Sequence, residues 1–431
     1  MRIWHILIFF SAFILGACES LPPLPGIPGS EATAQPTGTV PLDPGTDKTP
    51  QSTPTQPGPI PLRIWIPPEM DPEADTNAAL LFRSRLVEFV DLHEGVQLEV
   101  RIKSVSGPAG LLESLSTTSA AAPLALPDLI ALPNADLETA ALKGLLHPLD
   151  QLDEAIIDPD WYNYARSLAQ IQDRTYGLPF AGDALALVYR PEAVPAPPAD
   201  WSAILNNTLP LVFPAADPQA LFTLSQYQAK GGTVRDEEGR PHLDEEILEE
   251  VLIFYQEAKQ IGVFPLWLTQ HEDDNQIWEM YNEKEADLII TWTNRFLDDK
   301  PRDSAFTTIP THDGIPYTLS SGWVWAIPAH QPEHQELSLD LAEFLTDSDY
   351  LGEWTEAAGV LPTRESSLEV WSNIEVKPML EKIILSAQIL PSTDVLTSVG
   401  QVLKEATEQI LNEESDPETA AQQAVEGLTG P

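Results

Sequence analysis

Apolar residues in the first part of the chain recur at two spacings, one typical of strands and one typical of helices. A strand is predicted at residues 62–66, and residues 129–132 are a short apolar run, as expected of a strand that is buried on both faces. Residues 96–102 alternate apolar and polar side chains, which is the pattern of a half-buried strand. Helical spacing appears in the segments around residues 82–90, 111–119 and 137–143.

The second part of the chain has the same character, with longer helices. Strands are predicted at residues 184–189, 287–292 and 323–327. Apolar helical faces occur in three further segments, 247–258, 399–410 and 420–428. Because strands and helices alternate, the pattern predicts an α/β protein with mostly parallel sheets flanked by helices and a helical C-terminal region.

The N-terminus carries a targeting signal. Arg2 precedes an apolar run that ends at Cys18, the only cysteine of the 431 residues. The run is about 13 residues long, shorter than the ~20 that a membrane-spanning helix needs. Leu15-Gly16-Ala17-Cys18 resembles a bacterial lipobox, which implies cleavage before Cys18 and lipidation of its thiol. The alternative is an uncleaved membrane anchor that contains a small buried cysteine.

Residues 19–61 have the composition of a linker. They contain 12 prolines, with Gly, Thr, Ser and Gln between them, and no helical or strand periodicity. Such a segment buries too little apolar surface to fold, so we expect an extended, disordered tether. A proline-rich docking ligand is the alternative use.

The charge of the chain limits its partners. Acidic residues outnumber basic ones by 66 to 23, and the formal net charge is −43. This charge repels phosphate backbones, so we expect no nucleic-acid partner, and membrane attachment must come from the lipid on Cys18. No glycine-rich phosphate loop is present, and Pro332 breaks the helix that would align His330 with His334 on a metal. We therefore expect no cofactor and no metal.

Four passages share their order and spacing with one protein family. They are residues 127–130 with 144–150 (PDLI and GLLHPLD), 176–189 (YGLPFAGDALALVY), 198–205 (PADWSAIL) and 358–364 (AGVLPTR). In these passages the chain resembles the family 1 extracellular solute-binding proteins of ABC importers, the group that includes maltose-binding protein. The likeness extends from about residue 62 to residue 428.

The resemblance implies a two-lobed periplasmic-binding-protein fold of type II, with a ligand bound in the cleft between the lobes. It also implies a monomer that delivers its solute to the permease subunits of an ABC importer at the extracytoplasmic face of the cell membrane. The chain would divide into a signal peptide (1–17), a lipidated cysteine with its linker (18–61), a first lobe (62–181 and 320–362) and a second lobe with the C-terminal helices (182–319 and 363–431).

The resemblance assigns ligand contacts to the segments that cross between the lobes. Asp183 stands where members of the family place a carboxylate that accepts sugar hydroxyls. Trp292 stands where they often place a ring that stacks on a sugar. Ser321 comes just before the strand predicted at 323–327 and Trp323 begins it, with Gly322 between them, which would let the backbone approach a ligand closely.

Two further contacts are expected from the first lobe. Glu69 and Asn134 follow predicted strands, where the family often places polar groups that touch the ligand. Each of these candidates has a structural alternative, since an acid at a strand end can face solvent and a tryptophan can fill the core. Trp325 is expected in the core, and Arg364 in a structural ion pair.

The same comparison restricts the solute. Gly400 and Leu132 stand where maltose-binding protein has aromatic rings, so a long maltodextrin is not expected. Aromatic faces with a few carboxylates suit a neutral mono- to trisaccharide or polyol, whereas anions need several arginines or helix N-termini. A surface-anchored glycosidase and a sensor or adhesion lipoprotein with the same fold are the alternatives to a binding protein.

Overall fold

The structure is a computed structural model that describes residues 60–152, 156–329 and 334–429. The predicted signal peptide, Cys18 and residues 18–59 of the predicted linker lie outside the described residues. Among the helices that are described, none combines the length and the apolar character needed to cross a membrane.

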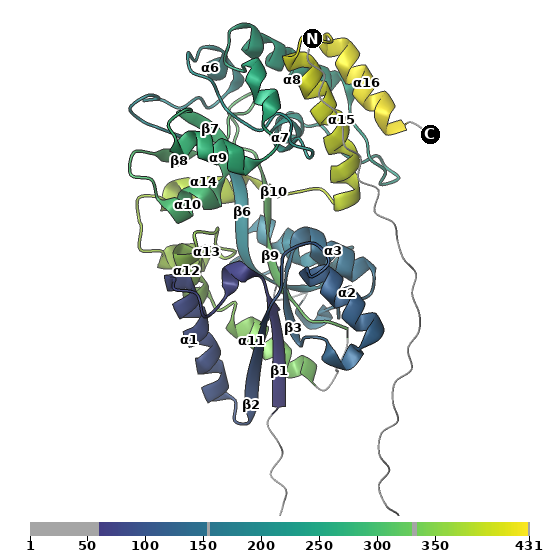
Figure 1. Cartoon of the computed structure of the whole chain (residues 1–431), viewed down its shortest axis with the longest axis vertical. Helices are drawn as coiled ribbons and strands as arrows, with labels where there is room; N and C mark the ends of the chain where they lie inside the picture. The colour runs from purple at the N-terminus through teal and green to yellow at the C-terminus, as the bar shows by residue number, and fades with distance from the viewer. Residues whose placement is uncertain (1–59, 153–155, 330–333, 430–431) are drawn as a thin grey trace, which may run out of the picture. The chain divides into compact units, whose positions relative to one another are not determined.

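Eight strands of the described chain form one mixed sheet in the order β2-β1-β3-β9-β6-β7, with β10 beside β9 and β8 beside β6 (Figure 1). The strands are β1 (Ile60–Ile66), β2 (Val96–Ile102), β3 (Leu129–Pro133), β6 (Gly177–Tyr189), β7 (Leu288–Trp292), β8 (Ala305–Thr307), β9 (Thr318–Ala326) and β10 (Ala387–Ile389), and a separate pair consists of β4 (Gln170–Ile171) and β5 (Arg174–Thr175). β1 is parallel to β2 and β3, and β9 is parallel to β10. β9 is antiparallel to β3 and β6, and β6 is antiparallel to β7 and β8.

The described helices cover the sheet and form the C-terminal region. They are α1 (Asn77–Leu92), α2 (Leu111–Ala121), α3 (Asn134–Leu142), α5 (Asn163–Ala169), α6 (Trp201–Leu205), α7 (Leu221–Ala229), α8 (Glu245–Gln260), α9 (Asp274–Asn282), α10 (Thr293–Asp299), α11 (Gln335–Phe344), α12 (Ser348–Ala358), α13 (Glu365–Val370), α14 (Lys377–Ser386), α15 (Thr393–Leu411) and α16 (Pro417–Thr429). In α1, the hydroxyl of Thr76 accepts the N–H of Ala79 and so caps the helix, and Phe82 and Phe89 are buried on its inner face.

The α/β class is confirmed, but the sheet is mixed rather than mostly parallel. Strand and helix alternation does not reveal that β6 and β9 cross between the lobes and run against their neighbours. Both strands are also longer than expected, because β6 begins at Gly177 and β9 at Thr318. Ser321 therefore lies inside a strand rather than before one, and Trp323 lies within β9 rather than at its start. β6 accommodates Pro179 at an irregularity of the β6–β9 pairing, which is where a strand tolerates proline.

Three crossing segments meet at Gly182. Gly182 is the register partner of Gly322 in the β6–β9 pair and exchanges two backbone hydrogen bonds, of 2.9 and 2.8 Å, with Leu361. A Cβ on Gly182 would overlap the ring of Tyr164, and one on Gly322 would overlap the carbonyl of Ala181. Glycine is therefore needed for this close approach.

The lobe boundaries expected from the sequence lie near this crossing. The boundary at 181/182 falls within β6, the one at 319/320 falls within β9, and the one at 362/363 follows Leu361 directly. No independent observation divides residues 62–431 into the expected lobes, so the boundaries stay predictions.

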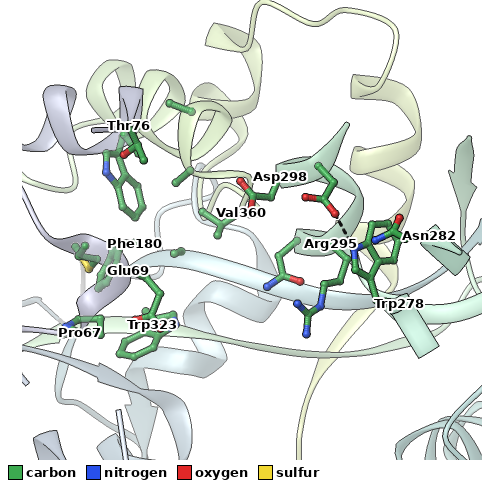
Figure 2. A pocket seen from close by; sticks show the side chains of 18 residues that line it. Pro67, Glu69, Thr76, Phe180, Trp278, Asn282, Arg295, Asp298, Trp323 and Val360 are labelled. Atoms are coloured by element: carbon green, nitrogen blue, oxygen red, sulfur yellow. Dashed lines mark hydrogen bonds between the residues drawn. The ribbon is translucent and has the colours of Figure 1, made fainter. Parts of the chain in front are cut away.

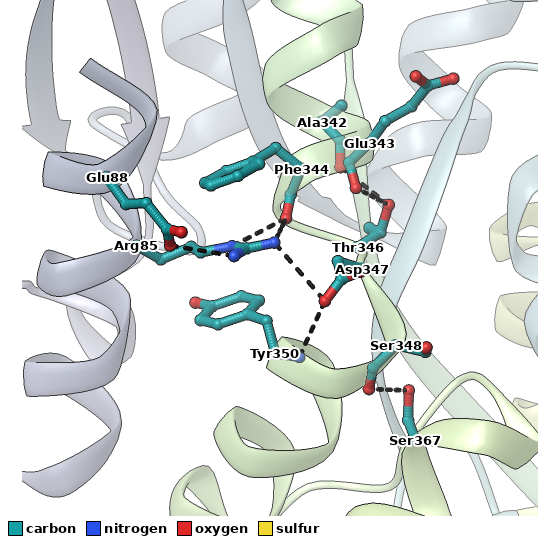
Figure 3. A network of polar contacts seen from close by, with 10 residues as sticks. All are labelled: Arg85, Glu88, Ala342, Glu343, Phe344, Thr346, Asp347, Ser348, Tyr350 and Ser367. Atoms are coloured by element: carbon teal, nitrogen blue, oxygen red, sulfur yellow. Dashed lines mark hydrogen bonds and ion pairs between the residues drawn. The ribbon is translucent and has the colours of Figure 1, made fainter. Parts of the chain in front are cut away.

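A half-buried arginine, Arg85, joins α1 to the helices that follow β9 (Figure 3). The Nε and Nη2 groups of Arg85 donate to the carbonyl of Phe344, at 3.1 and 2.8 Å. The guanidinium lies 3.5 Å from the centroid of the Phe344 ring and 5.1 Å from that of Tyr350. Asp347, 3.6 Å from Nη2, also accepts the N–H of Tyr350 and so caps α12. One side chain thus connects three helices.

We predict that Arg85→Ala lowers the free energy of unfolding by about 2 kcal/mol. The change removes two hydrogen bonds to Phe344, one to Glu88, the ion pair with Asp347 and two cation–π contacts from a half-buried position. Arg83→Ala is the matched control on the same helix. The Arg83 side chain is 42% exposed, and its ion pair with Glu73 is long, at 3.8 Å. Urea unfolding of both variants measures the difference. An equal loss in the two variants would contradict the role given to Arg85.

Candidate functional site

A cavity of about 530 Å³ lies against one face of the crossing strands, with walls from both lobes (Figure 2). We call it the aromatic cavity, after the rings in its walls. Figure 2 shows Glu69 and Trp323 at one end and Trp278, Asn282 and Arg295 at the other. The remaining walls include Thr76, Phe180, Asn294, Asp298, Asp299, Trp354 and Val360.

The first lobe and the crossing strands position one end of this cavity. Glu69 lies in a single 3-10 turn, Pro68–Met70, that follows β1 directly, and its side chain is exposed. Trp323 is half-buried on β9, opposite Ala181 of β6. Trp325, two residues further on the same strand face, is buried and stacks on Phe180 at 4.7 Å. Trp325 is therefore a core residue, as the sequence predicted, and Trp323 lines the cavity.

Helices α9 and α10 of the second lobe form the other end. The Nε1 group of Trp278 donates to Asp299 at 2.7 Å, which fixes the orientation of the indole. Arg295 donates from Nε to Asp274 at 2.7 Å. The other oxygen of Asp274 accepts the hydroxyl of Thr291 at 2.5 Å. The only cation in the cavity wall is thus already paired with a carboxylate.

Asp183 lies next to the cavity but is directed toward the start of α10. Its Oδ1 accepts hydrogen bonds from the hydroxyl of Thr293 at 2.6 Å, from the N–H of Asn294 at 3.1 Å and from the N–H of Ala184 at 2.9 Å. Burial raises the pKa of Asp183 to about 7, although these three hydrogen bonds favour the charged form. Asp183 lines neither the aromatic cavity nor the smaller pocket around Trp292 that is described next. Its contact with a ligand therefore stays a prediction.

Trp292 lies in a second, smaller pocket of about 180 Å³. We call it the acidic pocket, because four carboxylates line it together with Trp292 and Gln219: Asp217, Glu272, Asp273 and Asp274. Burial raises the pKa of Asp217, with repulsion from Asp273 and Asp274 as a smaller contribution. Since Asp274 lines this pocket and binds Arg295 of the aromatic cavity, one ion pair lies between the two spaces.

The remaining predicted contacts lie outside both spaces. Ser321 is half-buried and faces Asp183 across the β6–β9 pair. Asn134 is half-buried and is the first residue of α3. Arg364 pairs with Asp160 at 3.2 Å and lies 3.8 Å above the ring of Trp161, which confirms its structural role. Of the six predicted contacts, only Glu69 and Trp323 share one cavity.

Sequence reasoning missed three rings of the aromatic cavity: Phe180 on β6 and two tryptophans, Trp278 and Trp354. Both tryptophans lie on amphipathic helices, and both are less than 8% exposed, so a periodicity pattern assigns them to the core. A signal was present for Trp354, which lies one helical turn before the AGVLPTR passage at 358–364. No comparable signal marks Trp278.

The two positions at which aromatic rings are missing, Leu132 and Gly400, line neither the aromatic cavity nor the acidic pocket. Leu132 is fully buried in β3. A Cβ on Gly400 of α15 would lie 2.8 Å from the Cα of Gln219 and 2.8 Å from the carbonyl oxygen of Pro218. Neither position leaves room for an aromatic ring that faces a ligand.

The chain belongs to the bacterial extracellular solute-binding protein family, whose model matches residues 89–378. It is similar to the sugar-binding protein MalE of Xanthomonas citri, with 17% identity, a TM-score of 0.71, and coverage of 86% of this chain and 98% of that one. A cyclo/maltodextrin-binding protein complexed with maltotetraose has 21% identity, a TM-score of 0.68, and coverage of 87% and 98%.

A third similar structure is a solute-binding protein of Thermotoga lettingae bound with α-D-tagatose, with 20% identity, a TM-score of 0.61, and coverage of 85% and 98%. A comparison with curated protein sequences finds no match. At these identities the solved structures establish the fold, and they confirm the two-lobed architecture expected from the sequence.

The burial of Asp183 predicts a pH effect on stability. The folded state holds this proton with a pKa of about 7, against 3.8 for an ordinary aspartate, so the stability that this carboxyl contributes is lost as the pH rises from about 4 to about 7. Asp183→Asn removes the titration. The free energy of unfolding of the variant, relative to the parent, should rise by about 2–4 kcal/mol between pH 4 and pH 8.

Urea unfolding at several pH values between 4 and 8 measures this difference. A constant difference between the variant and the parent over that range would show that Asp183 does not carry a raised pKa.

Proposed function

We propose that this protein captures a small carbohydrate, a mono- to trisaccharide or a polyol, in the cleft between its lobes and delivers it to an ABC importer. The aromatic cavity carries the proposal, because indole faces pack against the C–H faces of sugars and carboxylates accept their hydroxyls. Trp323 and Trp354 supply the rings, and Glu69 supplies a carboxylate from the first lobe. Binding, with no chemical conversion of the solute, is what the family description supports.

The proposed solute is short for two reasons. The main chain around Pro218 and Gln219 fills the space beside Gly400, and Leu132 is buried. The similar structures are named for solutes that range from the monosaccharide tagatose to maltotetraose, so the fold accommodates both sizes. The local geometry of this chain favours the smaller ones.

We predict that Trp323→Ala weakens the binding of the solute by about 1–3 kcal/mol, the cost of removing a stacking ring. A thermal-shift screen against mono-, di- and trisaccharides and polyols identifies the solute, and titration calorimetry then measures the variants. Trp292→Ala shows whether the solute reaches the acidic pocket. Trp267→Ala is the control, since this half-buried ring lines neither the aromatic cavity nor the acidic pocket. Unchanged affinity in both Trp323→Ala and Trp292→Ala would refute the proposed site.

We further propose that the thiol of Cys18 is lipidated and holds the protein at the extracytoplasmic face of the cell membrane. The resemblance of Leu15–Cys18 to a lipobox and the proline-rich composition of residues 19–61 support this proposal. The net charge of −43 supports it as well, because no electrostatic attraction to anionic lipid is available.

Cys18→Ser should abolish lipidation and move the protein from the membrane fraction to the soluble fraction. Fractionation of cells that express the parent or the variant, followed by mass spectrometry of the N-terminal peptide, measures both effects. If the variant is cleaved normally and still sediments with membranes, the anchor lies elsewhere.

A further inference from the structure

We infer that the solute bound in this cleft carries a protonated amino group, as an aminated sugar does. The inference rests on the proposed function and narrows it from carbohydrates in general to those with a positive charge. It revises the neutral solute expected from the sequence, because the structure shows how the charges of the cleft are paired.

The walls of the aromatic cavity contain an excess of negative charge. Glu69, Asp298 and Asp299 line it, and Arg295 is the only cation among the lining residues. Arg295 is neutralised by Asp274, which lies outside this cavity. Among the described residues, no ion pair includes Glu69, Asp298 or Asp299. A cation placed between the two ends of the cavity would be attracted by carboxylates of both lobes.

The neighbouring acidic pocket also carries an excess of negative charge. Four carboxylates line it and no Lys or Arg does. Arg364, the second cation expected near the cleft, is paired with Asp160 and lines neither space. The cleft thus has no unpaired cation among its lining residues to balance its carboxylates.

The uncharged groups of the aromatic cavity also suit an ammonium ion. The faces of tryptophan rings attract cations, and Trp278, Trp323 and Trp354 line the same space as Glu69. The Oδ1 atom of Asn294 is buried in this wall and has no hydrogen-bond partner in the described structure. An ammonium has three donors and no acceptor, so it suits a wall of acceptors, and a rotation of the Asn294 side chain would add this oxygen to the lining carboxylates.

Carboxylates also accept hydroxyls from neutral sugars, so their presence alone does not distinguish the two kinds of solute. The unbalanced charge does distinguish them. An ammonium is attracted by the exposed carboxylates at both ends of the cavity, whereas a neutral solute gains nothing from their charge.

The test uses two pairs of sugars that differ mainly in amine charge: glucosamine against glucose, and the glucosamine disaccharide against its di-N-acetylated form. Titration calorimetry of the full-length protein at pH 6.5 should show at least about tenfold tighter binding of the amine in one pair. The preference should shrink at high salt, and also at a pH above the pKa of the amine.

Three variants test which residues cause the preference for the amine. Glu69→Gln and Asp298→Asn should each reduce the preference for the amine by about tenfold, because the amide oxygen still accepts a hydroxyl of the uncharged sugar but no longer carries the charge that attracts an ammonium. Glu192→Gln also removes one negative charge, but from an exposed turn after β6, and it should leave the preference unchanged. Equal reductions in all three variants would assign the preference to the net charge of the protein and overturn the role of the cavity.

The failure of this inference is distinguishable from the failure of the proposed function. Equal or tighter binding of the uncharged sugars overturns the inference and leaves carbohydrate binding in place. Binding of spermidine without a response to any saccharide supports the positive charge and overturns the carbohydrate proposal. No binding of either class overturns both.

Discussion

The close approach of three chain segments at Gly182 is the constraint on which the rest of the structure depends. Here β6 pairs with β9, and Leu361 bonds to the backbone of Gly182. One side of this crossing is filled by Tyr164, whose hydroxyl donates to the carbonyl of Pro362 at 2.8 Å. The other side presents Trp323 to the aromatic cavity. The segments that join the lobes and the wall that faces the solute are therefore the same few residues.

The acidity of the cleft follows partly from the way its helices begin. Asp217 accepts the N–H of Leu221 at the start of α7, Asp273 caps α9, and Asp183 accepts the N–H of Asn294 at the start of α10. An aspartate at a helix start is stabilised by the N–H groups that it accepts and by the helix dipole. These three side chains hold elements of the second lobe in place, and Asp217 and Asp273 also line the acidic pocket.

The sequence predicted the elements well and the site in part. The strand at 96–102 has the predicted bounds, and the helical face of residues 247–258 lies within α8, because local periodicity alone determines such elements. The antiparallel pairings of β6 and β9 depend on contacts between residues more than 100 positions apart, such as Asp183 and Ser321, and leave no periodic signal. Trp278 and Trp354 were missed for a related reason, since a tryptophan that lines a cavity and one that fills a core have the same spacing.

Gly400 has a consequence for how this protein can change. The size of the side chain at this position is limited by a contact between two main-chain segments, since α15 lies directly on the backbone of Pro218 and Gln219. A close contact between side chains can be relieved by one substitution. This contact is relieved only when the backbone of residues 214–220 takes another path. A side chain larger than glycine at residue 400 therefore requires an insertion or a deletion in that loop, and a point mutation at residue 400 alone does not make room for it.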